Sequence, residues 1–166
     1  MTDLLTPRLE LRRWSAEDVP RYARIMRDPE VSRFFGGPVP EEQVWRQVAL
    51  FIGHRALRGW SQAVVVERET GEFVGRGGLW RPPDWPGLEV GWVLDRSRWG
   101  RGYASELGRA SRDFAAHVLR EPHLISLIAP ANAASIRVAE AIGSSLEGEW
   151  TIGDTPVLIY GQDLHP

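Results

Sequence analysis

The chain of 166 residues contains no cysteine and no lysine, so all twenty of its basic residues are arginine. Without cysteine, disulfide bonds, thiolate metal sites and cysteine nucleophiles are excluded. Without lysine, a catalytic lysine is excluded as well. No apolar run reaches the length of a membrane span, and the opening "MTDLLTPRLELRRW" lacks the apolar core of a signal peptide. We therefore expect a cytoplasmic protein with no membrane partner.

The chain also lacks a large excess of charge of either sign, since its formal net charge is only −2. The arginines are spread along the chain rather than clustered, so we expect no nucleic-acid partner. A hydrophobic content of 43% and a charged content of 25% are ordinary for a globular protein. The length fits one domain, spanning residues 1–166, that can bury a substantial core.

Hydrophobic periodicity predicts a mixed α/β fold with the element order β-α-α-β-β-β-α-β-α-β-β. Because Pro20 falls inside the first helical pattern, that helix begins either at Ser15 or at Asp18. The continuous apolar run "LISLIAP" indicates a strand buried on both faces. The expected strands lie at 8–14, 60–69, 72–80, 88–95, 124–130, 144–152 and 156–163, and the expected helices at 15–28, 41–59, 103–119 and 132–143.

The stretch "SRWGRGYASE" (97–106) joins a predicted strand to a predicted helix through two glycines. Glycines at this point let several unpaired backbone N–H groups of the helix N-terminus converge, which suits a phosphate or pyrophosphate. Arg96, Arg98 and Arg101 add positive side chains around it. A Walker loop would need a lysine, and a Rossmann fingerprint would need a third glycine where Ser105 stands.

The sequence from Trp99 to Ala104, Trp-Gly-Arg-Gly-Tyr-Ala, resembles motif A of the GNAT N-acetyltransferase superfamily, Gln/Arg-x-x-Gly-x-Gly/Ala. Gly102 and Ala104 match, whereas Trp99 replaces the glutamine or arginine, as in the branch similar to the RimJ/RimL ribosomal-protein N-terminal acetyltransferases. The segment from Asn132 through Ser135 to Gly143 resembles a second motif of that branch. The stretches "TPRLELRRW", "RDPEVSRFF" and "LEGEW…LIYGQD" are similar too. The resemblance implies a GNAT-like acyl-CoA N-acyltransferase fold with a single mixed sheet.

The resemblance also implies a binding site for acetyl-CoA, between the strand that ends at Asp95 and the strand that ends at Ala129. The pantetheine would pair with the backbone of that first strand, and the pyrophosphate would lie on the glycine-containing loop. Asn132 would either reach the cofactor or cap the helix that follows it. The implied cofactor-binding residues are Trp92, Val93, Leu94, Trp99, Gly100, Arg101, Gly102, Tyr103, Ala104, Asn132 and Ser135.

Two residues are candidates for catalysis in the implied direct transfer of an acetyl group to an amine. Ser135 would donate a hydrogen bond or a proton to the departing thiolate, or it is merely a helix-start serine. Glu89 would be the general base, or it is a strand carboxylate paired with an arginine. Strand alternation places Glu89 on the same face as Gly91 and Val93, opposite Trp92. An α-amine has a pKa of about 7.7–8, so a weak base such as a carboxylate suits it better than a lysine amine.

The acceptor amine is the least determined feature of the sequence. Phe34, Phe35, Trp80 and Trp85 form either an aromatic acceptor cleft or ordinary packing. Acetylation of a protein N-terminus is the leading hypothesis; a small amine (aminoglycoside, polyamine or amino acid) and a non-catalytic acyl-CoA-binding module are the alternatives. The four histidines show no pairing typical of a triad or a metal site, so we expect no metal. A monomer and a homodimer both remain open.

Overall fold

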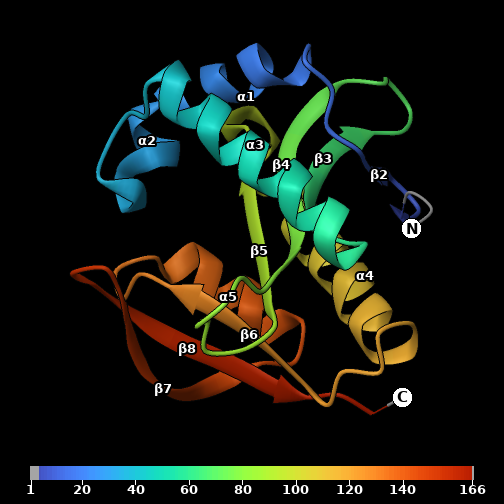
Figure 1. Cartoon of the computed structure of the whole chain (residues 1–166), viewed down its shortest axis with the longest axis vertical. Coiled ribbons are helices and arrows are strands. Elements are labelled where there is room, and N and C mark those ends of the chain that lie inside the picture. Colours follow the sequence, from blue (N-terminus) through green and yellow to red (C-terminus); the bar gives the residue numbers. More distant parts are fainter. Residues whose placement is uncertain (1–3, 166) are drawn as a thin grey trace.

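The computed structural model describes residues 4–165, in which one mixed sheet has the strand order β1-β2-β3-β4-β5-β6-β8-β7 (Figure 1). The predicted mixed α/β fold and its element order are confirmed, with a two-residue strand and a one-turn helix as additions. The strands are β1 (Leu4–Leu5), β2 (Leu9–Arg12), β3 (Gln62–Glu67), β4 (Phe73–Trp80), β5 (Glu89–Leu94), β6 (His123–Ile128), β7 (Ser145–Ile152) and β8 (Thr155–Asp163). The helices are α1 (Asp18–Arg27), α2 (Pro29–Ser32), α3 (Glu41–Arg58), α4 (Tyr103–His117) and α5 (Ala133–Ala141), with 3₁₀ turns at Arg33–Phe35 and Arg96–Arg98.

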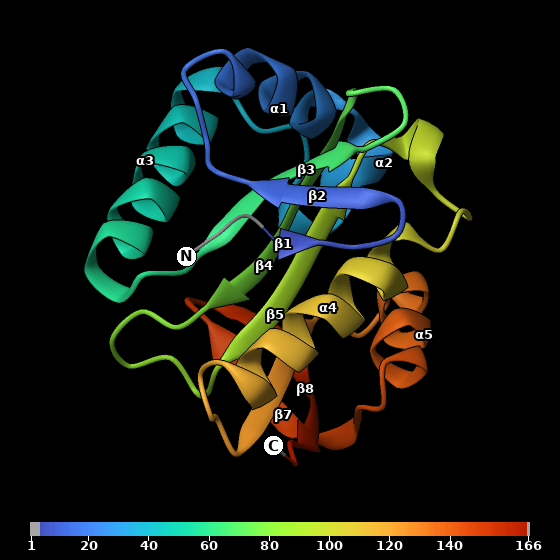
Figure 2. The same cartoon turned by 90° about the vertical axis from the view of Figure 1, so that its right-hand side faces the viewer.

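The sheet is antiparallel except at its middle, where β5 pairs with β6 in parallel. A parallel pair needs a crossover, and α4 supplies it between β5 and β6. Helices α1 and α3 lie over one face of the first five strands, and α4 lies over the other, with α5 beside it against β6 and β8 (Figure 2). Both faces of β5 are therefore covered.

Helix α1 begins at Asp18, the later of the two expected starts. The backbone N–H and the hydroxyl of Ser15 both donate to Asp18 Oδ2, at 2.9 and 2.8 Å, and Arg12 pairs with the same carboxylate at 2.7 Å. Pro20 then lies in the first helical turn, where a missing N–H costs no intrahelical hydrogen bond.

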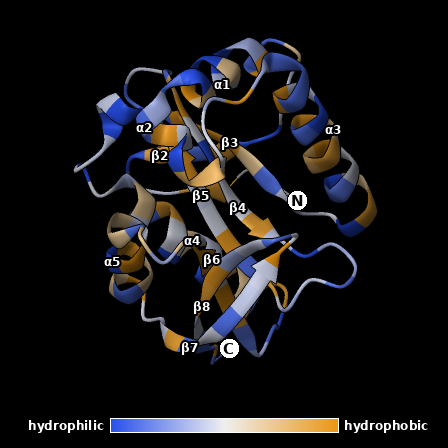
Figure 3. Cartoon of the chain, turned by 90° about the vertical axis from the view of Figure 1, so that its left-hand side faces the viewer, coloured by the Kyte–Doolittle hydropathy of each residue, from blue (hydrophilic) through white to orange (hydrophobic). Residues whose placement is uncertain are grey.

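Helix α1 packs on the sheet along one stripe. Blue and orange segments alternate along it in Figure 3, as expected for a helix that buries one face. The buried members of that stripe are the predicted residues Val19, Tyr22, Ala23 and Met26, and they join a core cluster that includes Val93 of β5. Leu94 instead packs against Tyr103 and Leu107 of α4. Neighbouring side chains of β5 thus belong to different cores, which is the alternation expected of a strand.

Candidate active site

Strands β5 and β6 part from each other soon after they meet. Their bridge joins Glu89 to Ile125, and the N–H of Ile125 donates to the carbonyl of Leu88 at 2.8 Å. The hydroxyl of Ser126 then reaches the carbonyl of Val90 at 2.9 Å. Beyond these contacts β5 runs away from β6, as Figure 1 shows. The pairing of β5 with β6 therefore stops in the middle of the sheet, with Glu89 where the two strands diverge, and we call this divergence of the strands the opening.

The backbone of β5 alternates between β4 and this opening. The N–H of Asp95 donates to the carbonyl of Val74 in the neighbouring segment at 2.8 Å, so the backbone groups of Val93 also point to β4. Those of Trp92 and Leu94 point to the opening, where the indole N–H of Trp99 donates to the Leu94 carbonyl at 3.0 Å. Of the three strand residues expected at the cofactor, Trp92 and Leu94 are the two whose backbone faces the gap.

The loop after β5 bends as the sequence predicts. Gly100 has a φ of 73° and Gly102 a φ of 77°, and Gly102 is the N-cap of α4. Both values lie in the left-handed region, which glycine adopts without a steric penalty. Tyr103 is buried, and its hydroxyl donates to Glu67 of β3. Ala104 packs beside the cluster that contains Tyr103. The first turn of α4 is thus anchored to β3 and to this core cluster.

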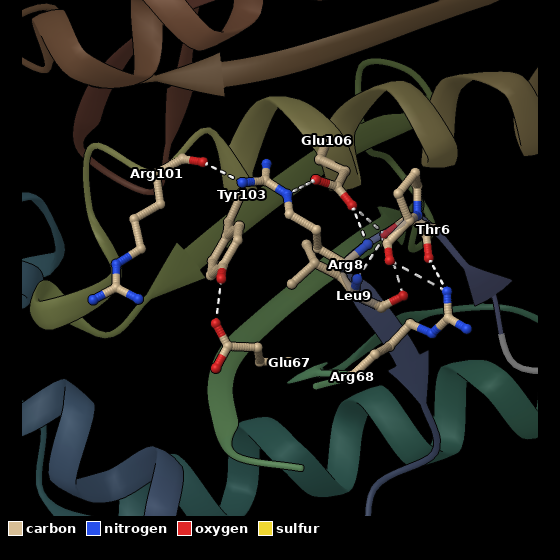
Figure 4. Close-up of polar contacts among 9 residues, drawn as sticks. Thr6, Arg8, Leu9, Glu67, Arg68, Arg101, Tyr103 and Glu106 are labelled. Atoms are coloured by element: carbon tan, nitrogen blue, oxygen red, sulfur yellow. Dashed lines mark hydrogen bonds and ion pairs between the residues drawn. The ribbon is translucent and has the colours of Figure 1, made fainter. Parts of the chain in front are cut away.

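The arginines around this loop are not equivalent. Arg98 turns toward the β3–β4 hairpin, where it pairs with Glu67 at 3.1 Å and with Glu72, and its charge is neutralised there. Arg96 lies 4.0 Å from Asp28. The expectation that all three arginines supply charge to a bound anion is therefore wrong for Arg98. Arg101 uses its backbone carbonyl to accept a hydrogen bond from Arg8 at 2.8 Å (Figure 4).

The start of α5 lies across the opening from β5. Asn132 is its N-cap, since Asn132 Oδ1 accepts from the N–H of Ser135 at 3.1 Å, so the capping role is confirmed. The indole N–H of Trp92 donates to Ser135 Oγ at 3.2 Å. The hydroxyl acts as an acceptor in this bond and keeps its own proton for a different partner. Trp92 packs beside three separate core clusters, and this holds Ser135 in a fixed orientation.

Glu89 lies on the same face of β5 as Gly91 and Val93, as alternation predicts. This is the face covered by α1 and α3, because Val93 packs in their core cluster. The indole N–H of Trp85 donates to Glu89 Oε2 at 2.8 Å. Burial raises the pKa of Glu89 from its ordinary value of 4.5 to about 7, against the opposing effects of the Trp85 hydrogen bond, the Arg76 charge and a backbone hydrogen bond from Leu127. A carboxyl with such a pKa exchanges protons near neutral pH.

A buried polar network that the sequence analysis missed lies behind Glu89. Arg76 is only 8% exposed; its Nε donates to the hydroxyl of Tyr22 at 2.8 Å and its Nη1 to Gln62 Oε1 at 2.7 Å. A β-carbon at position 91 would lie 3.0 Å from Gln62 Nε2, 3.6 Å from Glu89 Oε1 and 3.9 Å from Arg76 Nη1, so Gly91 lets these groups approach one another. An arginine among the inward residues of "FVGRGGLW" was the signal that could have revealed the network.

The four aromatic residues expected near the acceptor do not form one cluster. Trp80 packs on His54 and Phe51, with ring centroids 4.5 and 5.3 Å apart. Phe34 lies under the guanidinium of Arg33, and the neighbouring Phe35 is 49% exposed. Trp85 meets a residue that the sequence analysis missed, Trp150 of β7, in an edge-to-face contact at 5.2 Å. Because Trp85 also binds Glu89, this aromatic pair lies next to the opening.

Residues 4–165 contain neither a cluster of metal-ligating side chains nor a membrane-spanning helix. No group of three or more histidine, aspartate or glutamate side chains within that range is placed to hold a metal ion. In the same range, no helix combines the length and the apolar character needed to cross a membrane.

Comparison with known proteins identifies the family of this chain. Residues 8–145 match the family described as "Acetyltransferase (GNAT) domain". The uncharacterized protein YkkB of Bacillus subtilis (strain 168) is 30% identical over 162 residues, covering 96% of this chain and 94% of YkkB. The uncharacterized N-acetyltransferase p20 of Bacillus licheniformis is 28% identical, covering 89% and 85%. The crystal structure of an acetyltransferase from Agrobacterium tumefaciens str. C58 is 34% identical with a TM-score of 0.88, covering 98% and 94%.

More distant structures share the fold. They include the RimL ribosomal-protein alpha-N acetyltransferase in complex with coenzyme A, 18% identical with a TM-score of 0.78. An aminoglycoside acetyltransferase in complex with coenzyme A is 18% identical with a TM-score of 0.77. The spermidine N-acetyltransferase from Vibrio cholerae, in complex with coenzyme A and spermine, is 16% identical with a TM-score of 0.75. The family match, which covers most of the chain, means that this protein belongs to the GNAT family of acetyl-CoA-dependent acetyltransferases.

Proposed function

We propose that this enzyme transfers the acetyl group of acetyl-CoA directly to the α-amine of a protein N-terminus, as a member of the RimJ/RimL-like branch. The observation that carries the proposal is the position of Glu89: a carboxyl with a pKa of about 7 lies where β5 and β6 diverge. A base of that strength matches an amine whose own pKa is about 7.7–8.

The groups around the opening fit acetyl-CoA, which supplies the activated thioester. The bent loop from Trp99 to Gly102 and the first amides of α4 would hold the pyrophosphate, because a helix N-terminus favours an anion. The strand edge at Trp92 and Leu94 would pair with the pantetheine in the manner of an added strand. The indole N–H of Trp99 donates to the Leu94 carbonyl in this structure. A pantetheine amide that binds the same carbonyl would replace this indole hydrogen bond.

Two side chains would move the protons of the reaction. Glu89 accepts the proton that the acceptor ammonium must lose before its nitrogen can attack. Ser135, held by Trp92 and by the N-cap bond of Asn132, donates to the sulfur as it acquires negative charge. Trp85, in the loop between β4 and β5, fixes the Glu89 carboxyl by its hydrogen bond.

The charge behind Glu89 favours an acceptor with a single amine. Arg76 keeps a buried guanidinium on the same face of the sheet, within 3.9 Å of the β-carbon position above Gly91. A fixed positive charge at this place opposes the approach of a polyamine or an aminoglycoside, whose further ammonium groups add repulsion. A peptide N-terminus presents one amine followed by neutral amides.

An acceptor screen with labelled acetyl-CoA tests the proposal. The panel consists of N-terminal peptides, free amino acids, spermidine and an aminoglycoside, each at equal concentration and pH. We expect kcat/KM for the best peptide to exceed that for the polyamine and the aminoglycoside by at least about a hundredfold, which is ordinary for discrimination by polar groups. Preference for either polycation would overturn the proposed acceptor.

A further inference from the structure

The segment from Thr6 to Arg8, which precedes β2, is hydrogen-bonded to the first turn of α4 (Figure 4). Glu106 accepts three hydrogen bonds from it: Thr6 Oγ1 at 2.6 Å, the backbone N–H of Arg8 at 2.8 Å and Arg8 Nε at 2.6 Å. Arg8 Nη1 donates to the carbonyl of Arg101 at 2.8 Å. One side chain thus joins the glycine-containing loop to a carboxylate on the helix that follows it.

Arg8 also lies against the bend itself. Its guanidinium is over the ring of Tyr103, 4.7 Å from the centroid, and its Nη2 is 3.5 Å from where a β-carbon on Gly102 would be. Tyr103 is held at its other end by its bond to Glu67. The arginine is 48% exposed at its side chain, whereas the Glu106 side chain is 12% exposed. A partly exposed cation therefore covers a mostly buried anion at the base of the loop.

Without the pairing to Arg8, the Glu106 carboxylate would repel a phosphate group bound at the N-terminus of α4. It lies in the first turn of α4, near the same N-terminal amides that we assign to the pyrophosphate. A carboxylate there is itself attracted to the amides and repels a second anion. Burial disfavours its ionised form, but the hydrogen bonds from Thr6 and Arg8 outweigh burial and hold the pKa of Glu106 below its ordinary value. The carboxylate is therefore charged at neutral pH, and Arg8 neutralises it.

We infer that Arg8 is a positioning residue for the acyl-CoA site: it draws the Glu106 carboxylate away from the α4 N-terminus and fixes the Arg101 carbonyl, so that the loop amides face the pyrophosphate. This inference rests on the proposed assignment of the loop to the cofactor, and it adds Arg8, from near the N-terminus, to that site. Arg8 acts on the loop and on Glu106, and the function assigned to it needs no contact with the acceptor.

The test compares the variants Arg8→Gln, Glu106→Gln and their combination, with binding of acetyl-CoA to the full chain measured by calorimetry. Arg8→Gln leaves Glu106 charged and short of a cation, so we expect Kd to rise roughly five- to twentyfold. Glu106→Gln keeps one oxygen, which can still accept from Thr6 Oγ1 and the Arg8 N–H; it loses the bond that Glu106 Oε2 accepts from Arg8 Nε and removes the charge, so Kd should stay the same or fall. In the double variant at least half of the Arg8→Gln loss, on a logarithmic scale, should be recovered. No loss in the first variant, or no recovery in the double variant, overturns the inference.

A second measurement separates positioning from a general loss of structure. S-acetylpantetheine carries the thioester without the pyrophosphate, so Arg8→Gln should leave kcat/KM for it within twofold of the wild type, with the best acceptor of the screen. An equal loss on both thioesters overturns the inference.

The matched control is Arg68→Gln. Arg68 donates to the carbonyls of Thr6 and Pro7 in the same segment, at 2.6 and 3.3 Å, without a bond to Glu106 or to the loop. Its Kd for acetyl-CoA should be unchanged, and a rise equal to that of Arg8→Gln would contradict us. If Arg8→Gln does not fold, a rise in Kd for Glu106→Gln alone overturns the inference. Failure of the acceptor proposal is recognised separately, because the calorimetry needs no acceptor.

Discussion

Replacement of Glu89 by glutamine removes a charge without changing the shape of the side chain. We expect this change to alter both the stability of the protein and its kcat, each as a function of pH. Glutamine can still accept the hydrogen bond that Trp85 donates, so the local packing is kept. The raised pKa, from 4.5 to about 7, means that the folded protein binds this proton more tightly than the unfolded chain does. A shift of about 2.5 units corresponds to about 3 kcal/mol, since one unit is about 1.4 kcal/mol.

The sign of the stability effect follows from that tighter proton binding. As pH rises from about 4.5 to about 7, wild-type Glu89 must ionise inside the fold, so its contribution to the free energy of unfolding falls by about 3 kcal/mol. The Glu89→Gln variant has no such loss. Relative to the wild type, the variant should gain up to about 3 kcal/mol between pH 4.5 and pH 8, or roughly 6–12 °C in Tm for a chain of this length.

In contrast to its gain in stability, the Glu89→Gln variant should lose catalytic activity. As the proposed base, Glu89 must be ionised, so wild-type kcat should rise with pH through an apparent pKa near 7. The variant should lose that limb, and its kcat at pH 7.5 should fall roughly ten- to a hundredfold. This loss is at or below the usual range for general base catalysis, because part of an α-amine is already neutral at that pH. The assays are kcat profiles with a peptide acceptor and thermal melts from pH 5 to 8.5.

The control for both assays is Asp84→Asn, which neutralises an exposed carboxylate in the same loop as Trp85. Position 84 has a φ of 62°, which asparagine tolerates well. This variant should keep the wild-type limb and show no pH-dependent stability difference. An unchanged limb near pH 7 in Glu89→Gln would remove Glu89 as the base. A stability difference that does not vary with pH would refute the raised pKa.

Three further predictions concern the cofactor and the leaving group. Gly102→Val forces a branched side chain into a φ of 77°, so acetyl-CoA affinity measured by calorimetry should drop at least about tenfold; Gly153→Val, at a φ of 60° in the β7–β8 turn, carries a similar strain of about 1–3 kcal/mol and should bind normally. Ser135→Ala should lower kcat in a chemistry-limited assay with Kd for acetyl-CoA within twofold, and an unaltered kcat would deny Ser135 its role. Acetyl-CoA at a hundred times its Kd should add about 2.7 kcal/mol to the free energy of unfolding, and identical melts with and without it would count against the cofactor site.

The sequence by itself determined the parts of this protein that depend on local conformation. The element order, the stripe of α1 and the bend at Gly100 and Gly102 were all predicted, because periodicity and φ are properties of a few consecutive residues. Alternation along β5 also predicts that Glu89 and Trp92 lie on opposite faces of the strand, and the register of β4 and β5 agrees with this. The two-residue β1 and the single turn α2 were missed because each is too short to show a period.

The tertiary structure decided which residues that are distant in the sequence contact one another. Trp85 packs on Trp150 rather than on Phe34, Phe35 or Trp80, since the β7–β8 hairpin meets the loop between β4 and β5 only in the folded chain. Arg98 is neutralised by the β3–β4 hairpin, and Arg8 reaches α4 from nearly a hundred residues away. The pKa of Glu89 depends on the protein that encloses its carboxyl. Charge pairing and burial depend on distance in space, which no local pattern of residues records.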